Sequence, residues 1–171
     1  MILSGRLEYS HYSALELLAT SHEHVIVLTS SGALLRDNID LFLSKKVINS
    51  FGHYAATQLR KLHNVLIDNK DANQQEKNLY KDAMHLVRLL ITGADILEGK
   101  ALKAYRTDEH ELLLAIRNGS YNLQEIFVMA QEYERRFKLA SEQTSLPDQP
   151  DHTLVEQLMI GIYKHFLCKP L

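Results

Sequence analysis

The stretch "KNLYKDAMHLVRLLITG", from Lys77 to Gly93, contains three nitrogen-bearing side chains whose types and spacing suit the binding of an anion. Lys81, His85 and Arg88 follow one another at intervals of four and three, which places them on one side of a helix at about 100° per residue. Arg offers a planar fork and Lys a compact charge, and both match phosphate oxygens. The spacing therefore predicts one basic ridge on a helix.

A second ridge is predicted on the preceding helix, at the border of its apolar stripe. Tyr54, Gln58 and Lys61 repeat the intervals of four and three, so we expect these side chains to be half-buried. Tyr and Gln can stack on or hydrogen-bond a base or sugar, and Lys can bind phosphate. Two such ridges that faced each other would form an anion pocket. The alternative is that both are solvated helix faces.

The elements that carry these ridges follow from hydrophobic periodicity. Apolar residues recur every three or four positions over residues 51–66 and again through the opening stretch, which predicts two amphipathic helices. The second should end near Gly93 or Gly99, because glycine is the usual left-handed stop. A shorter helix should end at Asn118-Gly119, and Asn122 with Glu125 resembles a capping box for the next one. A last helix follows the connector "SLPDQPD".

The fold class predicted from these patterns is mainly α, with about five or six helices and a small N-terminal β element. The β element would consist of the β-rich pieces "SGRLEYS" and "HVIVLTSSG" on either side of a short helical segment. The chain has 171 residues, which is enough for one compact domain over residues 1–171. We expect residues 1–31 to form a strand, helix, strand remnant and residues 32–171 to form the helical region.

Composition limits the kinds of partner. The chain has 19 Lys plus Arg against 21 Asp plus Glu, so its net charge of -2 does not by itself predict nucleic-acid binding, and any basic site must be local. Cys168 is the only cysteine, which excludes an intramolecular disulfide and a Cys-based zinc cluster and favours a cytoplasmic location. No apolar run approaches the roughly 20 residues that cross a bilayer, so we expect no membrane partner.

Several segments, taken in order, resemble the C-terminal part of a bacterial and phage family of predicted nucleotidyltransferases in the DNA polymerase β superfamily. They are FLS-K at Phe42 to Lys45, the Tyr-x3-Gln-x2-Lys run that ends at Lys61, the Lys-x3-His-x2-Arg run at Lys81 to Arg88, and LP-x-x-PD at Leu146 to Asp151. The resemblance implies transfer of a nucleoside monophosphate from a nucleoside triphosphate with Mg²⁺. It also implies that Lys45 and the two ridges bind the nucleotide.

The sequence departs from this family at the catalytic motif. Family members place a Gly-Ser turn and an Asp-x-Asp pair ahead of the helical region, where the two carboxylates hold metal ions against the triphosphate. Asp37 and Asp40 are instead three apart, in what reads as a helix or turn, and only an i, i+2 pair on a strand would aim two carboxylates at one metal. Glu8 fits the third-carboxylate position and is the one metal ligand that we assign. We expect the chain to be catalytically incomplete on its own, so its catalytic residues remain unassigned.

Two functions of different classes follow. In the first, a degenerate enzyme retains a helical domain that binds a nucleotide or an RNA end; Mg²⁺ and a nucleoside triphosphate would be its cofactors if activity were retained. In the second, the chain is a protein-interaction or regulatory module derived from a nucleotidyltransferase. Either reading leaves apolar surface near the "HVIVL" piece, which a second copy of the chain or a catalytic partner chain would cover.

Overall fold

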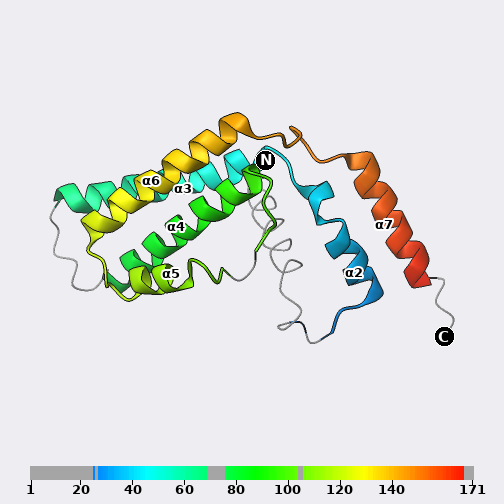
Figure 1. Ribbon diagram of the computed structural model, residues 1–171, viewed down its shortest axis with the longest axis horizontal. Helices are drawn as coiled ribbons and strands as arrows, with labels where there is room; N and C mark the ends of the chain where they lie inside the picture. Colours follow the sequence, from blue (N-terminus) through cyan, green and yellow to red (C-terminus); the bar gives the residue numbers. More distant parts are fainter. Residues whose placement is uncertain (1–24, 26, 69–75, 104–105, 168–171) are drawn as a thin grey trace. The chain divides into compact units, whose positions relative to one another are not determined.

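The computed structural model describes residues 25, 27–68, 76–103 and 106–167, and these residues form six α-helices, one short 3-10 helix and no strand. The mainly helical fold class is thereby confirmed (Figure 1). The elements are α2 Ser30–Asp37, η2 Ile39–Phe42, α3 Lys46–Asp68, α4 Glu76–Leu97, α5 His110–Arg117, α6 Leu123–Gln143 and α7 His152–Leu167.

The predicted N-terminal β element falls largely outside the described residues. Where its second piece is described, the end of that piece is helical, because α2 begins at Ser30. The cause is local: the Thr29 side-chain oxygen accepts a hydrogen bond from the Gly32 N–H at 3.1 Å, which caps the first turn of α2. Residues 30 and 31, the last two of the remnant expected over residues 1–31, are therefore helical, and the β element expected ahead of them stays a prediction.

The described residues divide into two compact units. One unit contains α2, η2 and α7, and its described residues fall within 1–46, 102–105 and 146–171. The other contains α3 to α6 and takes its residues from 47–101 and 106–145. The single domain expected over residues 1–171 stays a prediction.

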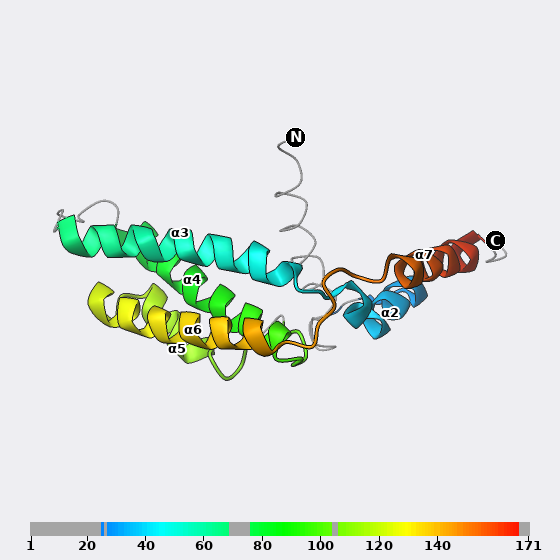
Figure 2. The same ribbon diagram turned by 90° about the horizontal axis from the view of Figure 1, so that it is seen from above.

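Helix α4 lies at the centre of the second unit, with α3, α5 and α6 packed around it (Figure 1, Figure 2). From residue 83 to residue 97 it is buried almost without interruption, and only His85 and Arg88 stay partly exposed. A helix surrounded on several sides must be apolar on more than one face. This explains why the two basic residues stand in such an apolar segment.

The helices α3, α4 and α6 meet at the ring of Phe137, which is 5% exposed. A Cβ atom added at Gly52 of α3 would lie 3.3 Å from this ring, and one added at Gly93 of α4 would lie 2.5 Å from it. Both glycines therefore allow the helices to approach the ring closely. Gly93 lies inside α4 and does not end it.

The helix ends agree with the predicted signals. Helix α4 stops at Leu97 and is followed by Gly99 with φ +72°, and α5 is followed by Gly119 with φ +75°. Both glycines adopt the left-handed conformation that favours this residue. Asn122 caps α6 by accepting from the Glu125 N–H at 2.9 Å, while the Glu125 carboxylate accepts from the Asn122 N–H at 2.8 Å. The capping box is confirmed.

In the first unit, helices α2 and α7 contact each other. The His165 Nε2 atom of α7 lies 2.9 Å from the Ser30 Oγ atom of α2, at hydrogen-bond distance. Apolar side chains of α7 are exposed, including Tyr163 at 61% and Leu167 at 76%. No helix within the described ranges is long and apolar enough to span a membrane.

Candidate phosphate-binding site

The basic ridge of α4 faces away from α3. The α4 residues that line the space next to α3 are Leu79, Asp82, Ala83 and Leu86. At about 100° per residue, positions 81, 85 and 88 lie on the opposite side of the helix. Apolar burial decides this orientation, because the α3 side carries leucine and alanine while the ridge carries charge.

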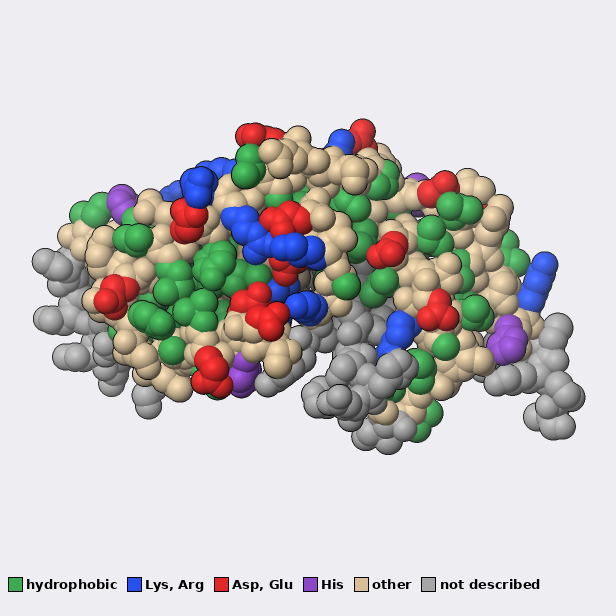
Figure 3. All heavy atoms as spheres, viewed as in Figure 1, with side chains coloured by type: hydrophobic (Ala, Val, Ile, Leu, Met, Phe, Trp, Pro, Cys, Tyr) green, Lys and Arg blue, Asp and Glu red, His purple; other side chains and the backbone are tan. Residues whose placement is uncertain are grey.

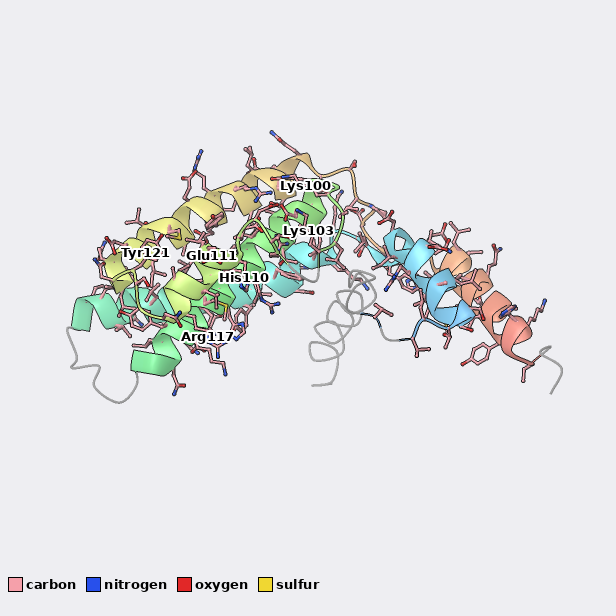
Figure 4. All side chains as sticks on the ribbon, turned by 60° about the horizontal axis from the view of Figure 1, so that its bottom comes forward. Lys100, Lys103, His110, Glu111, Arg117 and Tyr121 are labelled. Atoms are coloured by element: carbon pink, nitrogen blue, oxygen red, sulfur yellow. The ribbon has the colours of Figure 1, made fainter. Side chains whose placement is uncertain are left out.

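Arg117 of α5 joins this ridge. Helix α5 packs against α4, and Figure 4 shows Arg117 at the end of α5 where that helix lies beside α4. Its charge acts on His85 together with the charges of Lys81 and Arg88. We call Lys81, His85, Arg88 and Arg117 the basic cluster. All four belong to the second unit.

The environment of His85 shows how concentrated the positive charge is. Partial burial lowers the pKa of His85 below its usual 6.5, and the nearby charges of Arg88, Lys81 and Arg117 lower it further, while Asp82 opposes them. The imidazole is therefore neutral at pH 7. An anion bound among these cations would favour the protonated ring, so His85 can add a further donor and charge when an anion arrives.

Arg117 is not among the site residues predicted from the sequence. The signal available was its place in the last turn of a helix, directly before the predicted stop at Asn118-Gly119. That signal explains a basic residue by the helix dipole alone, since cations are favoured near helix C-termini. The approach of α5 to the ridge on α4 depends on helix packing, which the local sequence does not encode.

The second predicted ridge borders a different space. Gln58 and Lys61 of α3 line a cavity of about 30 Å³ that Asp82 of α4 also lines. That volume holds about one water molecule and no nucleotide. Lys81, His85 and Arg88 do not line this cavity. The two predicted ridges therefore do not face each other across this cavity. Tyr54, the third residue of the α3 ridge, is half-buried. Roles for Tyr54, Gln58 and Lys61 in nucleotide binding stay predictions.

Lys45 brings two of the resembling segments together within the first unit. Its Nζ atom lies 2.9 Å from the Asp148 carboxylate, and its N–H donates to the Pro147 carbonyl at 2.8 Å. The preceding Ser44 is 1% exposed. FLS-K and LP-x-x-PD thus form one structural contact. The side chains of Lys45 and Asp148 are 42% and 86% exposed, so this ion pair contributes little to stability.

A buried ion network holds the C-terminal part of α4. Arg106 donates to the Asp95 carboxylate at 2.8 Å and to the Thr92 hydroxyl at 3.2 Å, and Arg106 is only 6% exposed. Arg136 of α6 bonds both Asp95 and Glu98. Figure 3 shows basic and acidic side chains side by side over this end of α4. The network therefore ties α6 to α4.

The charges of the network shift its carboxyl groups in one direction. Burial alone would raise the pKa of Asp95, but hydrogen bonds from Arg106 and Arg136 outweigh it and lower that pKa. The hydrogen bond from Arg136, helped by Lys100, lowers the pKa of Glu98 to about 2. The segment "QEYERRFK" of α6 thus contains a structural arginine, Arg136.

The predicted metal ligand Glu8 lies outside the described residues, so its role stays a prediction. Across the parts of the chain that the structure describes, no three His, Cys, Asp or Glu side chains are grouped so that they could hold a metal ion. Asp37 ends α2 and Asp40 lies in η2, so neither is on a strand.

The family model RlaP, described as the RNA repair pathway DNA polymerase beta family, matches residues 13–161. The chain belongs to this family, in agreement with the resemblance to the DNA polymerase β superfamily. Neither a curated protein nor a solved structure matches the chain significantly.

Proposed function

We propose that the chain is a nucleotidyltransferase-related protein that binds the phosphate of a nucleotide or an RNA end at the basic cluster. The observation that supports this is that α4 and α5 pack together and that the charges of Arg88, Lys81 and Arg117 on these helices all lower the pKa of His85. Cations that act on the same group also repel one another, and a phosphate bound among them would relieve that repulsion. The family description supports RNA as the source of the phosphate.

The proposal extends to catalysis: the chain by itself transfers no nucleotide. Its support is the placement of Asp37 in α2 and Asp40 in η2, where successive side chains do not alternate as they do on a strand. Incubation with α-labelled triphosphates, an RNA acceptor and Mg²⁺ or Mn²⁺ should label nothing. Labelling that Glu8→Ala abolishes would show that a metal site exists.

Calorimetry on the full chain tests phosphate binding. ATP, GTP and CTP with Mg²⁺, and short RNAs with a 5′- or a 3′-terminal phosphate, should be compared with the same RNAs ending in hydroxyl groups. Arg88→Ala and Arg117→Ala each remove a charge-assisted contact of about 1.5–3 kcal/mol, which corresponds to a loss of affinity of about tenfold or more. High salt should weaken binding in the same direction.

Arg135→Ala is the matched control. Arg135 is an exposed arginine of α6 that pairs with Glu132 at 2.6 Å, and it is not part of the basic cluster. Its removal should leave the affinity nearly unchanged. No heat with any nucleotide or RNA would contradict the proposal and favour the interaction-module function. In that case sedimentation should show either a second copy of the chain or a protein partner.

A further inference from the structure

We propose that a groove between α3 and α6 binds one unpaired base of single-stranded RNA. The groove lies in the second unit, is open to solvent, has a volume of about 290 Å³ and is lined by Arg60 and His63 of α3 and by Phe127, Gln131 and Glu134 of α6. Figure 2 shows α3 and α6 side by side. The volume is close to the lower limit of about 300 Å³ for small-molecule sites, which suits a single ring system.

The aromatic pair in the groove is the first reason for a base. The rings of His63 and Phe127 are stacked, with centroids 5.4 Å apart and an interplanar angle of 26°. His63 is an exposed residue of α3, so part of its side chain stays accessible to solvent beside Phe127. Stacking on an aromatic ring is how proteins hold unpaired bases, and it tolerates any base because each has a flat face.

The polar groups of the groove are the second reason. Arg60 is exposed and lies one helical turn from His63, so that it can contact the phosphate attached to a base stacked on the ring. The amide of Gln131 can donate to and accept from a base edge. Glu134 pairs with Lys138, whose Nζ lies 3.0 Å away, and this pairing reduces the repulsion between that carboxylate and a phosphate.

This site goes beyond the proposed phosphate site and shares no residue with it. The basic cluster consists of residues of α4 and α5, whereas the groove consists of residues of α3 and α6. An RNA that reached both sites would be bound through a terminal phosphate at the basic cluster and through an internal base at the groove. Each site can fail in an experiment without the other, because separate substitutions report on each.

Fluorescence anisotropy with the full chain tests the groove. The probe is a labelled oligoadenylate of eight nucleotides, compared with an oligoribonucleotide of the same length and charge in which the bases are absent. His63→Ala should weaken binding of oligoadenylate by about 5- to 100-fold. His63→Phe should retain binding, because the stack is preserved. Neither should change the affinity for the base-free strand.

Two further variants complete the test. Asn64→Ala changes the exposed neighbour of His63 outside the groove and should leave affinity unchanged. Arg60→Gln should weaken both strands and reduce the slope of log affinity against log salt by about one. Circular dichroism should show the same melting temperature for every variant compared.

Equal binding of oligoadenylate by the native chain and by His63→Ala would overturn the proposal. So would equal binding of base-containing and base-free strands by the native chain. If His63→Ala instead dissociated a dimer seen by sedimentation, the groove would be a contact between copies of the chain, and the proposal would also fail.

Discussion

Gly93→Ala is expected to destabilise the second unit, although alanine normally stabilises a helix. The substitution improves helix propensity by about 1 kcal/mol. Against this, the new Cβ atom would lie 2.5 Å from Cε2 of Phe137, 3.0 Å from its Cδ2 and 3.4 Å from Cβ of Phe51. Carbon atoms prefer about 3.5–4.0 Å, so the closest contact is too short by about 1 Å.

The Phe137 ring has little room to move aside. A Cβ atom at Gly52 on α3 would already lie 3.3 Å from Cε1 of the same ring, so the ring is enclosed by the two glycine positions. Overpacking of this kind costs about 1–3 kcal/mol, and the close contact on both sides places this case at the upper end. After the gain in propensity, we expect a net loss of about 2 kcal/mol, or about 4–8 °C in melting temperature.

Urea denaturation followed by far-ultraviolet circular dichroism measures this loss, and a double-mutant cycle identifies its cause. Phe137→Leu shortens the side chain, so the cost of Gly93→Ala should fall by at least about 1 kcal/mol in that background. Gly161→Ala in α7 is the control, because an added Cβ atom meets nothing within 4 Å there and should stabilise the helix. A stable Gly93→Ala variant, or a cycle without coupling, would refute the close packing of α4 on Phe137.

Three other predictions concern charge. Asp95→Leu leaves a buried arginine without its carboxylate and should cost about 3–5 kcal/mol in urea denaturation, whereas Glu132→Ala, at an exposed pair, should cost much less. The pKa of Glu98 is lowered from 4.5 to about 2, so the contribution of this carboxylate to stability is full above about pH 4.5 and is lost as the pH falls toward 2. The urea midpoint of Glu98→Gln should therefore depend less on pH in acid than that of the native chain. An unchanged dependence would contradict the pairing of Glu98 with Arg136. The pKa of His85 lies below 6.5 in the folded chain, so stability decreases as the pH falls below 6.5. NMR titration should show the pKa of His85 rising in Arg117→Gln, and rising in the native chain when phosphate is added. No rise in either case would argue against the basic cluster.

Much of the secondary structure was predictable because its signals are local. The capping box of Asn122 and Glu125 involves groups three residues apart, and the stop after α4 needs only the left-handed conformation of Gly99. These interactions form wherever the local sequence permits. The role of Gly93 was not readable in this way, because a glycine that ends a helix and one that admits a neighbouring ring look the same in the sequence.

The sequence by itself determined that Lys81, His85 and Arg88 share one side of a helix, since helical spacing alone fixes that arrangement. Only the tertiary structure decided which side meets which neighbour. The packing of Leu79, Ala83 and Leu86 toward α3 turns the basic ridge away from Gln58 and Lys61 and toward α5, which carries Arg117. The same packing stacks His63 on Phe127 across 64 positions of the chain. The physical reason is that the hydrophobic free energy depends on the total apolar area that all packed helices remove from water. The arrangement that buries most area therefore decides which helices meet, and no single segment specifies it.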